Sequence, residues 1–265
     1  MKRRALGDTG IEISPLGLGT VKFGRNEQVK YPRHFQLPDD PSVRKLLAQA
    51  RELGINLLDT APAYGSSQER LGRLLPGPRS DWVIVSKVGE FFEQGASRFD
   101  FSYRTTIAVV EQSLRTLNTD YLDAVLIHSD GNDIAILENA GALDALRRLK
   151  TRGLIRAHGM SSKTVAGGLR TVAEMDIVMA TCNPSYNAEL PVLEAAAKNN
   201  RGVLIKKGLQ SGHIQGADGV EAAMRFIFSQ PGVSGMIVGT ISPDHLQSNA
   251  EILERILSDT DTEPT

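Results

Sequence analysis

Four side chains that can hold or move a proton follow short apolar runs in the first half of the chain. They are a carboxylate, a phenol, an amine and an imidazole: Asp59, Tyr64, Lys87 and His128. A phenol has a pKa near 10 in water, and a neighbouring ammonium favours its phenolate form. A carboxylate could hold that ammonium in place, and an imidazole could orient a carbonyl oxygen. Together they would form a donor array for an oxygen that gains negative charge. Each of them alone could equally be a cap, a rim residue or a structural side chain.

These residues lie at matching places in a repeating pattern of short strands and longer helices. Eight apolar runs alternate with eight helical segments, and the chain of 265 residues gives each unit the length of one strand–helix repeat. We predict strands over Leu16–Thr20, Ile55–Asp59, Trp82–Ser86, Leu122–Ile127, Ile155–Met160, Ile177–Thr181, Val203–Ile205 and Gly235–Val238. We predict helices over Ser42–Leu53, Ser67–Leu75, Ser102–Leu117, Ala135–Thr151, Thr164–Glu174, Pro191–Asn199, Val220–Ser229 and Pro243–Leu257. A β-hairpin is expected over Arg4–Ile13, and a frayed polar tail over Ser258–Thr265.

The alternation indicates an α/β fold, a (β/α)8 TIM barrel with an N-terminal β-hairpin. The short apolar strands fit a parallel sheet, because its strands are buried on both faces. An open doubly wound sheet is the rival fold, but the run Gly17–Lys22 lacks the third glycine of the dinucleotide-binding turn. No shift in composition marks a boundary, so we expect a single barrel domain over residues 1–265. Its active site should lie at the C-terminal ends of the strands.

The composition is that of an ordinary globular protein. A formal net charge of −1 gives no electrostatic case for binding nucleic acid or a membrane surface. No apolar run approaches the roughly 18 residues that a membrane-spanning helix needs. The one cysteine, Cys182, excludes an intramolecular disulfide, and the scattered histidines form no metal-binding motif. We therefore expect a cytoplasmic protein that binds no nucleic acid, membrane or metal.

Several short motifs occur along the chain in a fixed order. They are Asp59–Gly72, Ser86-Lys87, Leu126–His128, Gly159–Ser162 and Ile237–Thr240. Together with the opening hairpin they resemble the aldo-keto reductases, a family of nicotinamide-dependent (β/α)8 barrels. The resemblance spans Arg4 to Leu257 and implies an oxidoreductase that reduces aldehydes or ketones to alcohols by hydride transfer. It implies that Tyr64 is the general acid, that Lys87 paired with Asp59 tunes it, and that His128 orients the substrate.

The resemblance also implies a nicotinamide site whose residues depart from the usual pattern. The family usually has Ser-Asn and a Gln where this chain has Ser161-Ser162 and Asn183, whose side chains are shorter. Where an aromatic residue commonly stacks on the nicotinamide, this chain has Lys206; its stem could cover the ring, and its charge would disfavour the oxidised cofactor. Family habit favours NADPH, with NADH possible, although Gly239 replaces a commonly basic residue. The implied cofactor positions are Gly19, Thr20, Asp59, Ser161, Ser162, Asn183, Lys206, Lys207, Gly208, Leu209, Ser211, Gly239, Thr240, Ser242, His245 and Asn249.

Clues to the substrate lie in two loops. The loop after the third strand contains four phenylalanines: Phe91, Phe92, Phe99 and Phe101. They indicate either a pocket for an aromatic or apolar aldehyde or a loop packed onto the barrel. The segment Val21–Asp40 is typical of either a mobile lid or a disordered insertion.

The substrate that the resemblance implies is a small carbonyl compound, bound by a monomer or weak oligomer. Two other functions stay open. One is a nicotinamide-binding regulatory or scaffold barrel with negligible turnover. The other is a barrel lyase or hydrolase that uses Lys87 and Asp59 without nicotinamide, since barrels host many chemistries.

Overall fold

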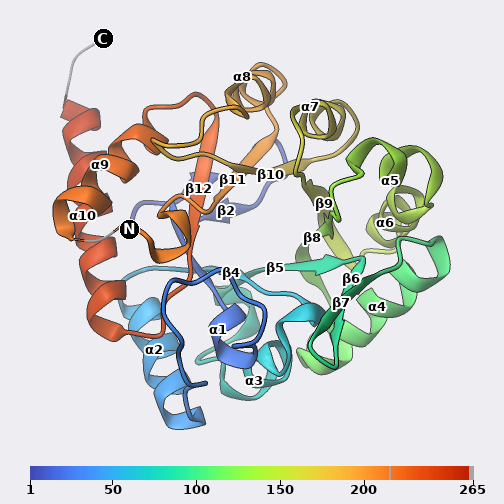
Figure 1. Cartoon of the computed structure of the whole chain (residues 1–265), viewed down its shortest axis with the longest axis horizontal. Coiled ribbons are helices and arrows are strands. Elements are labelled where there is room, and N and C mark those ends of the chain that lie inside the picture. The colour runs from blue at the N-terminus through green and yellow to red at the C-terminus, as the bar shows by residue number, and fades with distance from the viewer. Residues whose placement is uncertain (215, 263–265) are drawn as a thin grey trace.

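The centre of the molecule is a closed barrel of parallel strands (Figure 1). The computed structural model describes residues 1–214 and 216–262, and within them the barrel has eight strands. They are β3 (Leu16–Gly19), β4 (Leu57–Asp59), β5 (Val83–Val88), β8 (Leu122–His128), β9 (Ile155–Ser161), β10 (Ile177–Thr181), β11 (Gly202–Lys206) and β12 (Val233–Val238). Strand β12 pairs with β3 and closes the ring. The predicted TIM barrel is therefore confirmed.

Helices surround the barrel on the outside, with two helices after β8 (Figure 1). They are α2 (Asp40–Glu52), α3 (Ser67–Leu74), α4 (Tyr103–Thr116), α5 (Asp133–Asn139), α6 (Ala142–Thr151), α7 (Val165–Glu174), α8 (Leu190–Lys198), α9 (Ala217–Phe228) and α10 (Pro243–Thr262). Among the described residues, none of these helices has the length and hydropathy that a bilayer span requires. The predicted strand–helix alternation holds throughout, with ends shifted by a few residues.

One predicted helix is two. The segment expected to be helical over Ala135–Thr151 divides into α5 and α6, and the second begins after Gly141. Gly141 has a φ of 86°, in the left-handed region that glycine adopts without steric cost. A continuous helix cannot pass through that conformation, so the chain turns there.

The polar end of the chain is more ordered than its composition indicates. Helix α10 continues past Ser258 to Thr262, so the tail predicted to fray from Ser258 is helical as far as the structure describes it. Arg225 on α9 holds this extension, because its Nη2 lies 2.8 Å from Oδ2 of Asp259. Residues 263–265 of the predicted tail lie outside the described residues.

The strand side chains alternate between two apolar layers. In β4, Leu57 belongs to the cluster inside the barrel, and Leu58 belongs to the larger cluster between the strands and the helices. In β5, Val85 points inward and Ile84 outward in the same way. This is the two-residue period of a strand. Because both layers are buried, the barrel strands carry apolar residues on both faces.

The predicted N-terminal hairpin closes one end of the barrel. Its strands are β1 (Arg4–Ala5) and β2 (Glu12–Ile13), which pair antiparallel. Leu6, Ile11 and Ile13 are at most 1% exposed and belong to the cluster inside the barrel. The hairpin therefore plugs the end opposite the C-terminal ends of the strands.

The loop after β5 folds into a second hairpin where the sequence indicated only a loop. Its strands are β6 (Glu90–Glu93) and β7 (Ala96–Phe99), next to the end of β5 in Figure 1. The Arg25 guanidinium lies 3.5 Å from the centroid of the Phe92 ring, and Arg98 covers Phe91. Phe99 stacks on Phe101. Of the two uses considered for these rings, packing of the loop is the one observed.

Truncating the barrel plug should destabilise the whole fold. We predict that Leu6→Ala lowers the free energy of unfolding by about 2–4 kcal/mol, because it leaves a cavity at a fully buried position. Urea denaturation followed by circular dichroism measures this change. Leu169→Ala is the matched control, because Leu169 is 40% exposed on α7 and should change stability by less than about 1 kcal/mol. Equal effects of the two substitutions would show that the hairpin does not seal the barrel.

Candidate active site

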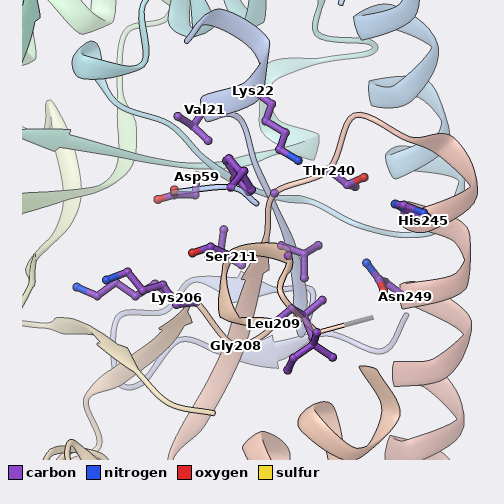
Figure 2. Close-up of a pocket in the computed structure, with 18 of the residues that line it drawn as sticks. Val21, Lys22, Asp59, Lys206, Gly208, Leu209, Ser211, Thr240, His245 and Asn249 are labelled. Carbon is purple, nitrogen blue, oxygen red and sulfur yellow. The ribbon is translucent and has the colours of Figure 1, made fainter. Parts of the chain in front are cut away.

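The C-terminal ends of the barrel strands surround a cavity of about 780 Å³. Asp59 ends β4, Lys87 lies near the end of β5, and His128 ends β8, so three neighbouring strands bring their side chains to one wall. Tyr64 reaches the same cavity from the turn after β4. In Figure 2, Asp59 and Lys22 lie on one side, Lys206 and Ser211 on the other, and His245 and Asn249 approach from a helix.

Lys87 and Asp59 form an ion pair at the bottom of the cavity. Their side chains are 2% and 7% exposed, and Nζ of Lys87 also donates to the Thr60 carbonyl at 3.0 Å. Thr20 fixes the strand end, since both its amide and its hydroxyl donate to the Asp59 carbonyl. A buried charge is costly unless it is paired and hydrogen-bonded, so these contacts determine where the Lys87 ammonium lies.

Tyr64 is positioned by a short 3-10 turn, Pro62–Tyr64, that extends from the end of β4. The Lys87 ammonium lies 4.9 Å from the centroid of its ring. Burial, followed by the carboxylate of Asp59, raises the pKa of Tyr64 well above 10.0. Burial and the Asp59 carboxylate thus outweigh the nearby Lys87 ammonium, which is itself paired with Asp59. Tyr64 is therefore protonated near neutral pH.

His128 stands beside Tyr64, with the two rings edge to face and their centroids 6.2 Å apart. Its Nδ1 lies 2.7 Å from Oε2 of Glu90 in the second hairpin. Burial lowers the pKa of His128, although Glu90 acts to raise it. Burial acts to raise the pKa of Glu90, but His128, Ser97 and Arg25 outweigh it and bring that pKa to about 2. Near neutral pH a neutral imidazole therefore faces an ionised carboxylate.

Lys206 ends β11, and its side chain crosses to the end of β9. Its Nζ donates to Oγ of Ser161 at 2.8 Å and to the carbonyl of Ser162. Burial lowers the pKa of Lys206 to about 7, against the opposing charge of Glu189. The ammonium is thus hydrogen-bonded to the two serines that were predicted to bind the nicotinamide amide.

The structure brings most of the other predicted cofactor positions to the cavity wall. The predicted cofactor residues that line the cavity are Gly19, Asp59, Ser161, Lys206, Lys207, Gly208, Leu209, Ser211, Gly239, Thr240, His245 and Asn249. Their elements are the ends of β3, β4, β9, β11 and β12 and the first turns of α10. The predicted set therefore extends around the barrel mouth from β9 to β4.

Four predicted cofactor positions do not line the cavity. Thr20 binds the Asp59 carbonyl, and Ser242 accepts the His245 amide at the start of α10. Asn183 uses its amide within its own loop, donating to the Lys207 carbonyl and accepting from the Ser185 amide. Ser162 is fully buried behind Ser161. The side chains of Thr20, Asn183 and Ser242 therefore bind backbone groups near the cavity and do not line it.

The segment Val21–Asp40 contributes to the cavity in a way that the sequence motifs did not indicate. It begins with a short helix, α1 (Val21–Gly24), and then brings Tyr31 across the mouth. A Cβ on Gly239 would lie 2.3 Å from the Tyr31 hydroxyl, so the glycine leaves room for this ring. The Lys22 ammonium lies 3.9 Å from the Tyr31 ring centroid. No motif marks Tyr31, because its place depends on how a long loop folds back.

The loop after β11 has a strained backbone. Lys207 and Ser211 have φ values of 55° and 56°, in the left-handed region that residues other than glycine rarely adopt. Both residues line the cavity. Strain of this kind occurs at functional sites because it directs backbone groups toward a ligand.

The cavity has features that fit a nicotinamide dinucleotide. Its lining includes the cations Lys22, Arg33, Lys206 and Lys207 opposite a single carboxylate, that of Asp59, as suits a ligand with phosphates. Beside the lining, the buried Oγ of Ser162 has no hydrogen-bond partner among the described residues. The volume is within the range of cofactor sites.

Neither metal binding nor a reactive thiol finds support in the described part of the chain. The histidines, cysteine and carboxylates there form no group of three or more that could hold a metal ion. Cys182 is buried, and burial raises the pKa of its thiol to about 11, so it is protonated at neutral pH.

Comparisons with known proteins agree with this geometry. A family model described as the aldo/keto reductase family matches residues 15–219. A crystal structure from Pseudomonas aeruginosa, whose title reads "putative aldo-keto reductase", is 53% identical and covers 96% of each chain, with a TM-score of 0.89. Methylglyoxal reductase YeaE of Escherichia coli is 28% identical over 84% of each chain. L-galactose dehydrogenase of Arabidopsis thaliana is 33% identical over 60% of this chain and 47% of its own length. The chain thus spans about half the length of some of the curated relatives that it matches.

The buried lysine should make stability depend on pH in a defined window. The Lys206 pKa of about 7 lies below its ordinary 10.5, so between these values the unfolded chain binds more protons than the folded one. This group therefore adds stability as pH rises through the window and adds a constant penalty below it. We predict that the melting temperature of Lys206→Met relative to the wild type is highest near pH 7 and declines toward pH 10.5.

Differential scanning fluorimetry of both proteins across this pH range measures the difference. Lys198→Met is the matched control, because Lys198 lies at the end of α8 on the surface. A difference between Lys206→Met and the wild type that stays constant with pH would contradict the prediction.

Proposed function

The chain belongs to the aldo/keto reductase family, and on that basis we propose that it reduces aldehydes or ketones to alcohols with NADPH as hydride donor. The observation that carries the proposal is the convergence of Tyr64, Lys87, Asp59 and His128 on one cavity. These residue types together provide a proton donor and a charged environment for the oxygen of a carbonyl group. A lyase or hydrolase would leave the cofactor-sized cavity without a purpose.

The proposed proton donor is Tyr64. Its raised pKa keeps the phenol protonated at working pH, so its hydroxyl can donate to the carbonyl oxygen as that oxygen gains charge. The Lys87 ammonium, fixed by Asp59, lies close to the phenol ring and offsets part of the charge that develops there. His128 occupies the next strand end and orients the substrate.

A bound reduced nicotinamide would supply the hydride. We propose that Ser161 and Ser162 hold its carboxamide, and that the strained loop after β11 holds the pyrophosphate through Gly208 and Ser211. His245 and Asn249 of α10 are then placed for the 2′-phosphate of NADPH. The choice of NADPH over NADH rests on these α10 contacts, because Gly239 supplies no charge.

The substrates that we propose are small carbonyl compounds. The names of two relatives, methylglyoxal reductase and L-galactose dehydrogenase, refer to small, oxygen-rich molecules. The aromatic aldehydes suggested by the four phenylalanines lose that support, because these rings pack onto the hairpin and do not line the cavity. A cytoplasmic monomer or weak oligomer remains part of the proposal.

Removing the Tyr64 hydroxyl tests the proposed reaction directly. We predict that Tyr64→Phe lowers kcat for methylglyoxal and 4-nitrobenzaldehyde by at least about 100-fold, because a general acid contributes that much. NADPH consumption measures the rate. The Kd for NADPH should change less than about threefold, since the hydroxyl is not proposed to hold the cofactor.

Tyr103→Phe is the control, because Tyr103 is 46% exposed on α4. The increase in NADPH fluorescence measures cofactor binding. Quenching of Trp82 fluorescence is a poorer signal, because Trp82 precedes β5 at the end of the barrel opposite the cavity. Turnover that survives in Tyr64→Phe would overturn the proposed role of Tyr64. Cofactor binding by the wild type without turnover would favour a regulatory or scaffold barrel.

Lys206 offers a second test, on the cofactor rather than the rate. The ammonium lies where the resemblance puts the nicotinamide, so it should disfavour the positively charged oxidised ring. We predict that Lys206→Tyr tightens binding of NADP⁺ relative to NADPH by about tenfold. Calorimetric titration of both cofactors measures the ratio. The ratio should stay unchanged in Lys198→Met, and an unchanged ratio in Lys206→Tyr would show that Lys206 does not contact the ring.

A further inference from the structure

Two of the lysines that line the cavity come from barrel strands, and only one of them is paired with a carboxylate. Lys87 pairs with Asp59. Lys206 ends β11 and lines the same cavity, but within the described part of the chain its Nζ forms no ion pair. A buried ammonium without such a partner is costly, which favours the neutral amine. The proposed function places Lys206 beside the nicotinamide ring and makes no use of its amine.

Two hydrogen bonds hold the Lys206 amine in the cavity wall. Its Nζ donates to Oγ of Ser161 at 2.8 Å and to the carbonyl oxygen of Ser162. A neutral amine has two N–H groups and one lone pair, so these two acceptors account for both of its N–H groups. The lone pair then has no polar partner among the described residues. Because Lys206 and Ser161 both line the cavity, a ligand there can reach this nitrogen.

The charged and titratable groups around Lys206 come from five parts of the fold. They are Glu189 before α8, Lys207 after β11, Asp133 of α5, Lys163 after β9 and His128 at the end of β8. Burial has the largest effect on Lys206 and lowers its pKa to about 7, while the two carboxylates act to raise it and the two lysines to lower it. About half of the molecules therefore hold a neutral amine at pH 7. An amine with the ordinary lysine pKa of 10.5 is neutral in only about one molecule in three thousand.

We propose that Lys206 is a second reactive group of the cavity, whose amine condenses reversibly with small aldehydes to form an imine. Nζ attacks the carbonyl carbon, a C–N bond forms, and the carbonyl electron pair moves to the oxygen, which takes one proton from the nitrogen. The resulting hydroxyl leaves with the second nitrogen proton as water, and a C=N bond remains. The step needs no oxidant or reductant. Lysines that form imines with carbonyl compounds are commonly activated by desolvation or by a neighbouring cation.

The effect of this imine on the enzyme rests on the proposed reductase function, because that function places the nicotinamide against Lys206. The imine and the nicotinamide would then need the same space. An aldehyde that reaches the cavity before the cofactor would be captured by Lys206 and would block cofactor binding. An aldehyde that arrives after the cofactor would find Lys206 covered and would bind beside Tyr64.

Reduction traps the imine and shows where it forms. The protein without cofactor is incubated at pH 7 with a limiting amount of propanal and with sodium cyanoborohydride, which converts an imine into a stable secondary amine. Peptide mass spectrometry then locates each added propyl group. We predict that Lys206 is labelled at least about tenfold faster than Lys198, an exposed lysine at the end of α8. Equal labelling of the two lysines, or no label on Lys206, would overturn the proposal.

The pH dependence separates a reactive amine from one that is merely accessible. We predict that the label on Lys206, relative to the label on the other lysines, decreases as pH rises from about 7 toward 10.5. The Lys206 amine is already largely neutral above pH 7, whereas amines with the ordinary pKa continue to lose protons. A relative label that stays constant over this range would contradict the proposal.

Variants test the assignment with intact-mass measurements. Lys206→Arg keeps a cation at this position but cannot form an imine, so most of the adduct formed with limiting propanal should be lost. Lys198→Arg is the matched control and should leave the amount of adduct unchanged. Circular dichroism confirms that each variant is folded, and the peptide map of the wild type decides the proposal if Lys206→Arg does not fold.

NADP⁺ tests whether the cofactor covers Lys206, because it binds as a cofactor but cannot reduce propanal. We predict that NADP⁺ at about ten times its Kd slows labelling of Lys206 by about tenfold and leaves labelling of Lys198 unchanged. Labelling of Lys206 that NADP⁺ does not slow would refute the shared space.

NADPH consumption with propanal separates the imine from the reductase function. Labelling of Lys206 without turnover would support the imine while the proposed reductase function fails. Turnover of propanal without labelling of Lys206 would support the reductase function and refute the imine.

Discussion

The buried ion pair between Lys87 and Asp59 is the constraint on which the cavity depends. Neither charge would be tolerated alone in the barrel mouth, so each strand end must hold its side chain against the other. The Thr20 hydroxyl donates to the Asp59 carbonyl, and the Thr60 carbonyl accepts a hydrogen bond from the Lys87 ammonium. With Lys87 neutralised in this way, the nearby phenol is governed by burial and by Asp59, and Tyr64 stays protonated. The pair therefore affects the pKa of Tyr64 as well as the positions of the strand ends.

Two segments outside the barrel give the site its second electrostatic feature. Arg25, from the segment after α1, lies on Phe92 and reaches Glu90, so the long first loop and the second hairpin support each other. Their contact brings a carboxylate to the back of His128, on the side away from the cavity. The loops thus determine the charges that surround the His128 ring.

At the ends of β11 and β12, the cavity wall combines Lys206 and Gly239 with a ring from a distant loop. Where the family commonly has an aromatic residue, Lys206 crosses to Ser161, and the aromatic ring at the mouth is Tyr31 from a distant loop. Tyr31 fits because Gly239 has no side chain. Gly239 thus supplies no basic side chain, but it leaves the space that Tyr31 occupies.

The sequence by itself determined the barrel, its hairpin plug and the four residues at the strand ends. These features follow from local patterns. The spacing of apolar residues, the turn residues and the polar residues after each strand can all be recognised from neighbouring positions in the sequence. The resemblance to the aldo-keto reductases also named many of the residues that line the cavity. Only the tertiary structure decided the direction in which the pKa of Tyr64 shifts, the contact of Glu90 with His128 and the place of Tyr31. Each of these depends on burial or on distances between residues far apart in the chain, and no local pattern encodes them.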